Sequence, residues 1–566
     1  MKIWRINLIY FLFVFFTLII ITRLVFLQII NGELNRALAK GQQEIFQEIS
    51  GARGEIFLYD KDALVPVATN KSSQLCYAVP KLIEDDERIA QLLAPILDLE
   101  EEEILEAIKD KDRLFSQLKR EVSAEKVDEI IKLELKGIGL REEPLRFYPD
   151  DSLASDVLGF VNKNGEGQYG IEGYWDDNLT GRGGWQRIEY GPFGRFLEGD
   201  TAAMTRGADL ILTIDRNIQS QAEGLLGSYT ERFDFQGGQI IVLEPLTGRI
   251  LALADFPSFN PNEYEKYAES KEIEIFQNKS IQGLYEPGSV FKVVTMAAAL
   301  NEEKITPETT YVDRGYVVIS GEKISNYNEK VWGERTMTEV LERSINTGAV
   351  FAESQLNHNI FTDYLQRFGI FEKTNIGLQG EVYSENKEFK KGWEINFATA
   401  SFGQGIEMNL LQIARAYCAI ANKGKLIQPY LVEKIIKNGI TEELKRDDSP
   451  KQIITPNTAS QVTKMLVSVA ENGYSKPARV PGYYIAGKTG TSQIPFSVLG
   501  MNQSGYSDQT WQTFIGFAPA FEPKFVIAIK LDNPNTKTAS ESTSLIFKDL
   551  AKYILDYYKI PPDREF

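Results

Sequence analysis

Residues 285–292 read YEPGSVFK and lead directly into VVTMAAAL. The Pro-Gly pair predicts a turn that delivers Ser289 to the first turn of an apolar, alanine-rich helix. The three-residue spacing places Ser289 and Lys292 on one helix face, where a lysine held in a dry environment can lose its proton and accept one from the serine. An isolated S-x-x-K pattern is more often a helix-capping serine with a surface lysine, so the interpretation depends on other segments.

Two further polar segments follow in the chain. Ser344-Ile345-Asn346 lies at a predicted bend between helical segments. Its hydroxyl is suited to proton relay, and its carboxamide is suited to hydrogen bonding with a substrate amide. Lys488-Thr489-Gly490-Thr491 follows the strand-like run PGYYIAG, where a peptide could add as an extra strand. The lysine and the threonine hydroxyls would then bind a carboxylate terminus. Taken singly, the first segment is also typical of a helix cap and the second of a polar strand end.

The composition excludes several classes of partner and catalytic site. The chain has 62 Lys and Arg against 79 Asp and Glu, and the formal net charge of -17 repels polyphosphate, so we expect no nucleic-acid partner. His358 is the only histidine, which removes the usual Ser-His and Cys-His arrangements and almost every zinc site. Cys76 and Cys418 alone predict no disulfide framework. Any nucleophile needs another base, and we expect neither a metal nor a cofactor.

The amino-terminal half contains two predicted segments. Within residues 1–30, a short tip precedes an apolar run from Ile6 to Ile30, which is long enough to cross a bilayer and is interpreted as a membrane anchor. Positive charges on both sides of the run leave its orientation open. A cleaved signal peptide is the alternative, but the small-residue site at 37–39 lies too far beyond the run. Residues 31–206 mix short strands with a charged stretch of helical periodicity, whose acidic clusters are interpreted as a solvated face.

A new domain is predicted over residues 207–566. DLILTIDRNIQSQAEGLLGSY predicts a strand followed by a helix, and QIIVLEPLTGRILALADF predicts a hairpin. With further strands between Tyr483 and Leu531, we expect a sheet closed by both ends of the domain, in the α/β or α+β class. Gly165 to Gly170 matches the G-x-G-x-x-G dinucleotide pattern, but turn residues follow it, so we predict a glycine loop.

The three polar segments, in this order, resemble the S-x-x-K, S-D-N and K-T-G set shared by penicillin-binding proteins and class A β-lactamases. The wider resemblance is to class B penicillin-binding proteins, monofunctional transpeptidases with one amino-terminal membrane anchor. RGEI and YGIEG, which begin at Arg53 and Tyr169, are similar to landmarks of the family's membrane-proximal domain. LTIDRNIQ, LEPLTGRILALADFPSFNPNEY, SFGQGIEMNLLQIARAY, GKTGTSQ and FIGFAPA are similar to successive segments of its transpeptidase domain.

The resemblance implies a fold and a reaction. A central antiparallel sheet flanked by helices would fill residues 207–566, above an elongated pedestal of the dimerisation type over residues 31–206 and one transmembrane helix. Ser289 would attack the D-Ala-D-Ala carbonyl of a peptidoglycan stem peptide while Lys292 takes its proton, and an amine from a neighbouring peptide would resolve the acyl-enzyme. β-Lactams would acylate the same serine and remain attached.

The resemblance also implies a role for each remaining motif residue. Ser344 would pass a proton to the departing amine, and Asn346 would hold the acyl amide. The segment of Lys488, Thr489, Gly490 and Thr491 would receive the terminal carboxylate, and the backbone N–H groups of Ser289 and Thr491 would form the oxyanion hole.

Two departures from β-lactamases bear on the reaction. Ile345 stands where β-lactamases often carry aspartate, as is ordinary for transpeptidases. Glu353 to Asn357 imitates the deacylating E-x-x-L-N element of class A β-lactamases, but it lies inside a predicted helix close behind Ser344, so efficient hydrolysis is not predicted.

The family also implies a location and partners. We expect a single-pass protein of the cytoplasmic (inner) membrane, with its catalytic domain outside, that serves cell division or elongation. The segment FIGFAPA favours division. Expected partners are the stem peptides, β-lactams as covalent inhibitors, the membrane, a membrane glycosyltransferase and other divisome or elongasome proteins. Two alternatives stay open: a D,D-carboxypeptidase or endopeptidase in which water replaces the amine, and a non-enzymatic scaffold or β-lactam sensor.

Overall fold

A five-stranded antiparallel sheet forms the centre of the part of the chain that carries the three motifs. Its strands are β11 (Gly237–Leu243), β12 (Ile250–Phe256), β21 (Ala486–Pro495), β22 (Tyr506–Ala518) and β23 (Phe525–Asp532). The computed structural model describes residues 4, 11–18, 20, 44–113, 115–190, 196–201, 205–270, 272–444 and 449–564. The strand order is β12-β11-β23-β22-β21, so strands from both ends of the predicted domain close one sheet, as expected.

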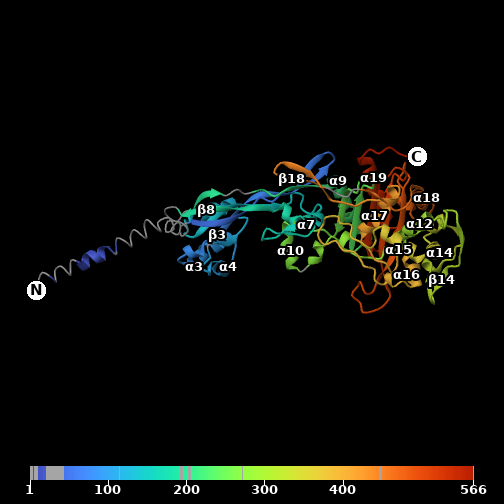
Figure 1. Ribbon diagram of the computed structural model, residues 1–566, viewed down its shortest axis with the longest axis horizontal. Coiled ribbons are helices and arrows are strands. Elements are labelled where there is room, and N and C mark those ends of the chain that lie inside the picture. The colour runs from blue at the N-terminus through green and yellow to red at the C-terminus, as the bar shows by residue number, and fades with distance from the viewer. Residues whose placement is uncertain are drawn as a thin grey trace. The chain divides into compact units, whose positions relative to one another are not determined.

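Both faces of this sheet are covered by helices. Alternate residues of β11 point to opposite sides: Ile240 and Val242 join one core, and Ile241 and Leu243 join the other. The first core includes α9 (Arg216–Phe233) and α19 (Thr543–Tyr557), and the second includes α12 (Lys292–Asn301), α17 (Leu410–Ala421) and α18 (Pro456–Asn472) (Figure 1). Because helices cover both faces, β11, β12 and β23 are apolar at most positions, whereas β21 and the first half of β22 carry many polar residues.

The predicted local elements of this region are confirmed. β10 (Asp209–Asp215) runs directly into α9, whose amino terminus is capped by the Asp215 carboxylate. β11 and β12 pair as the predicted hairpin. The G-x-G-x-x-G stretch covers the end of the turn after β6 (Phe160–Val161), the two-residue strand β7 (Gly167–Gln168) and the first residue of α7 (Gly170–Tyr174), a helix of only five residues.

The chain is divided into two compact units. The larger contains Glu55–Thr69, Phe147–Leu179 and Ala208–Phe566, and the smaller contains the described residues of Met1–Gly54, Asn70–Arg146 and Thr180–Gly207. The predicted boundaries at residues 30 and 206 stay predictions. Most of the predicted anchor lies outside the described residues, and none of the helices described is both long and apolar enough to cross a membrane.

The smaller unit combines strands with short helices. β1 (Glu44–Gly51), β8 (Gly181–Tyr190) and β9 (Phe196–Thr201) form an antiparallel sheet. The predicted charged helices are α3 (Asp86–Leu97) and α4 (Glu101–Ile108), and α5 (Ala124–Lys132) follows β4 (Ser116–Lys119). Their apolar residues form a separate core while the acidic residues of α4 are exposed, as the periodicity predicts.

The remaining strands and helices lie outside the central sheet. Strands outside the central sheet are β2 (Ile56–Asp60), β3 (Ala63–Ala78), β5 (Ile138–Phe147), β13 (Thr310–Asp313), β14 (Tyr316–Ile319), β15 (Glu322–Ser325), β16 (Gly333–Thr336), β17 (Lys425–Leu426), β18 (Val432–Lys437), β19 (Ile440–Glu443) and β20 (Lys451–Gln452). Further α-helices are α6 (Ser155–Leu158), α8 (Asp176–Leu179), α10 (Tyr264–Glu269), α11 (Lys279–Gln282), α13 (Met337–Glu342), α14 (Asn346–Ser354), α15 (His358–Arg367) and α16 (Glu394–Ala400).

Candidate active site

Ser289 lies in a tight turn that leads into α12. Gly288 has φ +60°, a left-handed conformation that favours glycine, and residues 288–291 form one 3₁₀ turn before α12 begins at Lys292. The structure thus places Ser289 in a 3₁₀ turn just ahead of the helix, where the prediction had the first helical turn. Ser289 is partly exposed while the residues on either side of it are buried. The turn therefore presents one hydroxyl to the outside.

Lys292 is completely buried and lies against that hydroxyl. Its Nζ is 3.0 Å from Ser289 Oγ, 2.6 Å from the Ser344 carbonyl oxygen and 2.8 Å from Asn346 Oδ1. Burial, followed by repulsion from Lys488, lowers the pKa of Lys292 well below its ordinary value. A neutral amine has two N–H groups and one lone pair. The carbonyl and amide oxygens can only accept hydrogen bonds, so they take the two N–H groups and leave the lone pair for Ser289.

Ser344 lies at the bend between α13 and α14, as predicted. It adopts a left-handed conformation, with φ +53°, and α14 starts at Asn346. The Asn346 amide group is engaged at both ends, because its Oδ1 meets Lys292 and its Nδ2 donates to the Ser325 carbonyl oxygen at 3.0 Å. In this structure the Asn346 side chain therefore orients Lys292.

A buried carboxylate supports this bend from behind. Asn326 Oδ1 accepts hydrogen bonds from the backbone N–H groups of Asn346 and Thr347 at 3.0 and 3.1 Å. Asp313, 2% exposed, accepts in turn from Asn326 Nδ2, Thr347 Oγ1 and the backbone N–H of Trp332. Sequence reasoning missed both residues, because they belong to no motif and their contacts are long-range.

The Lys488–Thr491 segment lies on β21, the last strand of the sheet, which pairs with β22 on one side only among the described strands. Lys488 is completely buried, and its Nζ lies 2.9 Å from both Ser344 Oγ and the Thr489 carbonyl oxygen. Burial lowers the pKa of Lys488 to about 7. Ser344 Oγ is also 3.3 Å from Lys292 Nζ, so one hydroxyl lies between the two lysines.

The other residues of this segment fit the turn and the strand edge. A Cβ at Gly490 would lie 2.9 Å from the Pro287 carbonyl oxygen, so glycine permits the strand to approach the Ser289 turn. Thr489 and Thr491 share the opposite strand face from Lys488. Thr491 Oγ1 accepts a hydrogen bond from the Ala539 N–H at 3.1 Å, which leaves its hydroxyl proton available for an acceptor.

Other sequence features lie apart from this cluster. Glu353 is in the last turn of α14, and its Oε1 is 3.7 Å from His358 Nε2. The His358 ring stacks on Phe397, with centroids 3.9 Å apart. Cys76 and Cys418 are both free and buried.

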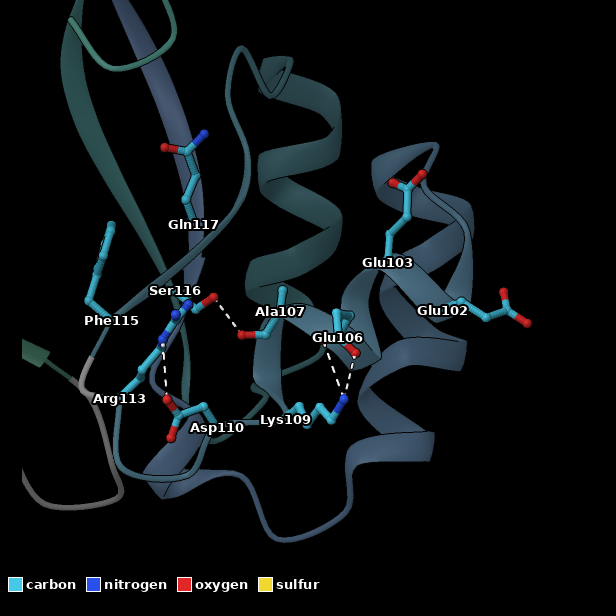
Figure 2. A pocket seen from close by; sticks show the side chains of 10 residues that line it. All are labelled: Glu102, Glu103, Glu106, Ala107, Lys109, Asp110, Arg113, Phe115, Ser116 and Gln117. Atoms are coloured by element: carbon cyan, nitrogen blue, oxygen red, sulfur yellow. Dashed lines mark hydrogen bonds and ion pairs between the residues drawn. The ribbon is translucent and has the colours of Figure 1, made fainter.

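The smaller unit contains a charged hollow of about 870 Å³. Figure 2 shows two ion pairs in its wall, Lys109 with Glu106 at 3.1 Å and Arg113 with Asp110 at 3.4 Å. The Ser116 hydroxyl there donates to the Ala107 carbonyl oxygen at 2.6 Å. The charged side chains of this hollow are exposed, and four of them form the two ion pairs, so it offers no activated nucleophile.

Comparisons with known proteins agree with this geometry. Residues 238–552 match the family description "Penicillin binding protein transpeptidase domain", and residues 48–212 match "Penicillin-binding Protein dimerisation domain". The chain is 32% identical to stage V sporulation protein D of Bacillus subtilis, over 91% of this chain and 80% of that protein. It is 30% identical to a peptidoglycan D,D-transpeptidase FtsI homolog of Mesostigma viride, over 99% of this chain and 96% of that protein.

The fold is also that of a solved relative. Penicillin-binding protein 3 from Mycobacterium tuberculosis, crystallised with aztreonam, superimposes with a TM-score of 0.70 at 24% identity, over 92% of this chain and 98% of that chain. The chain therefore belongs to the penicillin-binding protein transpeptidases, enzymes of the serine acyl-transferase class.

Proposed function

We propose that this chain is a peptidoglycan D,D-transpeptidase that cross-links stem peptides through an acyl-enzyme on Ser289, in cell division or cell elongation. One observation carries the catalytic assignment: Lys292 Nζ, completely buried and held by two acceptor oxygens, lies 3.0 Å from Ser289 Oγ. A lysine in that state can act as the general base that the histidine-poor sequence otherwise lacks.

Acylation follows from this arrangement. As Ser289 Oγ attacks the carbonyl carbon between the two D-alanines, its proton moves to Lys292. The backbone N–H groups of Ser289 and Thr491 would hold the developing oxyanion. The C–N bond then breaks, and a proton reaches the departing amine through Ser344 Oγ, which lies between the two lysines. Terminal D-alanine leaves, and the remaining peptide stays on Ser289 as an ester.

Deacylation completes the transfer. The amine of a neighbouring stem peptide attacks the ester carbon, an amide bond forms between the two peptides, and Ser289 recovers its proton from the attacking amine through Lys292. A β-lactam would acylate Ser289 in the same way. Because its opened ring remains attached to the acyl group, the acceptor amine is excluded and the enzyme stays blocked.

The edge of β21 is the proposed carboxylate-binding segment. A bound carboxylate would give Lys488 a counter-ion and so favour its charged form, and the hydroxyls of Thr489 and Thr491 supply donors two residues apart on one strand face. The bond from the Ala539 N–H orients the Thr491 hydroxyl so that its proton is free for the substrate. A stem peptide would add to the edge of β21 that pairs with none of the described strands.

The proposal includes a location. Residues 1–30 would hold the chain in the cytoplasmic membrane as a single-pass anchor. Residues 31–206 would form a non-catalytic pedestal domain of the dimerisation type, and residues 207–566 would form the catalytic domain on the extracytoplasmic side. The apolar run from Ile6 to Ile30 supports the anchor. The proposed partners are a membrane glycosyltransferase and other division or elongation proteins, because cross-linking would act on newly made glycan strands.

Labelled penicillin tests the acyl-enzyme. It should mark the wild type and leave Ser289→Ala unmarked, and equal labelling of both would end the proposal. Purified protein should next receive stem peptide together with an acceptor amine. A cross-linked product is expected, whereas free tetrapeptide as the sole product would indicate a carboxypeptidase. The last test uses cells that lack a paralogue and carry Ser289→Ala as their sole copy of the protein. A normally cross-linked wall in these cells would favour the alternative of a non-enzymatic scaffold.

A further inference from the structure

The side chain of Glu286 lies three residues before Ser289 and is only 7% exposed. Its carboxylate accepts hydrogen bonds from two donors that are far apart in the chain. The backbone N–H of Gly405 donates to Oε1 at 3.0 Å. The Tyr506 hydroxyl, at the start of β22, lies 3.2 Å from Oε1 and 3.0 Å from Oε2.

The backbone around Glu286 is joined to the same two parts of the fold. Tyr285 exchanges backbone hydrogen bonds with Met408, at 3.0 and 3.1 Å, and the N–H of Gly288 donates to the Gly403 carbonyl oxygen at 3.0 Å. On the other side, Ser492 Oγ of β21 donates to the Glu286 carbonyl oxygen at 2.8 Å. The turn that presents Ser289 is therefore held between residues 403–408 and the sheet edge, and the Glu286 carboxylate bonds to both.

We propose that ionised Glu286 is a positioning residue for acylation, because its carboxylate fixes the Ser289 turn against the Gly405 loop and Tyr506. The inference rests on the proposed function, since it concerns the geometry of the Ser289 nucleophile. Glu286 does not touch the reacting atoms in this account. It acts by keeping the turn in the position from which Ser289 Oγ meets both Lys292 and the substrate carbonyl, where small displacements are costly.

The charge state of Glu286 makes the inference testable. Burial raises the pKa of Glu286 to about 7, repulsion from Glu407 adds to the rise, and the bonds from Gly405 and Tyr506 oppose it. Burial and the nearby Glu286 and Glu407 raise the pKa of the Tyr506 hydroxyl, so it remains a donor at neutral pH. As pH falls through about 7, Glu286 gains a proton and becomes a poorer acceptor for both donors.

The test compares penicillin acylation rates of the full chain between pH 5.5 and 8.5. Glu286→Gln keeps the shape of the side chain but cannot ionise. The ratio of wild-type to Glu286→Gln rates should be near one at low pH and should rise about tenfold through pH 7, because contributions from Lys292 and Lys488 cancel in the ratio. Tyr506→Phe removes a hydrogen-bond donor to the carboxylate and so should raise the pKa of Glu286 further. The acylation rate of this variant, divided by that of Glu286→Gln, should therefore rise at a pH about one unit higher than the wild-type ratio does.

Glu223→Gln is the matched control. Burial also raises the pKa of Glu223 to about 7, but this residue is on α9, where it bonds to Gln219 and to the N–H of Ala154. The ratio of wild-type to Glu223→Gln acylation rates should stay constant across this pH range. Melting temperatures of all variants separate loss of fold from loss of positioning.

The outcomes are distinct. A flat ratio for folded Glu286→Gln, or an unshifted profile for Tyr506→Phe, would overturn the inference while leaving acylation of Ser289 intact. Loss of the proposed function would appear differently, as labelling that persists in Ser289→Ala. If Glu286→Gln does not fold, the shift in Tyr506→Phe decides the question alone.

Discussion

The lysine cluster of the larger unit and the charged hollow of the smaller unit use the same residue types with opposite results. Lys109 in the hollow is exposed and forms an ion pair with Glu106. Lys292 and Lys488 are completely buried and meet hydroxyl, carbonyl and amide oxygens. Burial without a counter-ion makes a lysine a base near neutral pH, whereas exposure with a counter-ion keeps it a passive cation. Substitutions in the two regions should therefore have very different effects on acylation.

Replacement of Lys292 should have the largest effect. Lys292→Met fills the same volume but has no lone pair for the Ser289 proton, so we expect acylation by penicillin to fall by about 10³-fold or more. Stopped-flow measurements with a fluorescent penicillin would show this. Lys109→Met in the hollow is the matched control and should acylate at the wild-type rate. A Lys292→Met protein that acylates normally would remove the proposed base.

Crowding of the Ser289 turn should come next. Gly403 has φ +79°, and a Cβ there would lie 2.3 Å from the Gly288 carbonyl oxygen. We expect Gly403→Ala to lower acylation by about 10²-fold and to destabilise the fold by roughly 2–4 kcal/mol. Gly392→Ala shares the strained backbone, with φ +75°, but a Cβ there meets nothing within 4 Å. It should cost only about 1 kcal/mol and leave acylation unchanged.

Loss of the support behind Ser344 should have an intermediate effect. Asp313→Asn would turn an NH₂ group toward the donors of Asn326, Thr347 and Trp332. We expect acylation to fall by about tenfold, because the Asn346 end of α14 loses its fixed position against Lys292. Exposed Asp363→Asn on α15 is the control. Unchanged rates in Asp313→Asn would show that Asn326 alone holds the bend.

Neutralising the hollow should change least. Glu106→Gln breaks an exposed ion pair, which contributes little to stability. We expect wild-type acylation and a melting temperature within about 1 °C of the wild type. A marked loss of acylation would show that the smaller unit takes part in the reaction.

Local pattern predicted much of this fold. The hairpin of β11 and β12, the strand–helix pair of β10 and α9 and the helices of the charged stretch all follow from apolar periodicity within one segment. The motifs also identified the groups that the structure brings together around Ser289. The predictions from the motifs succeed because each motif lies at a local feature of the chain, which is a Pro-Gly turn, a bend or a strand edge.

The rest of the site depends on pairings between distant residues. Asp313 meets Thr347, and Glu286 meets Gly405 and Tyr506, across separations of 34, 119 and 220 residues. No period or spacing in the sequence marks such a contact. The sequence also could not predict that the Asn346 side chain bonds to both Lys292 and Ser325, because Ser325 comes from a separate hairpin. Among these residues, only Glu286 could have been singled out from the sequence, because it is an acidic residue directly before the predicted Pro-Gly turn.

The ionisation of Lys292 tests the central claim most directly. Protein labelled with ¹³C at the lysine ε-carbons can be titrated by NMR, with Lys292→Arg and Lys488→Arg used to assign the two buried signals. The account predicts that Lys292 loses its proton well below the ordinary lysine pKa and that Lys488 does so near 7. Titration of both at the ordinary value of about 10.4 would contradict a buried base beside Ser289.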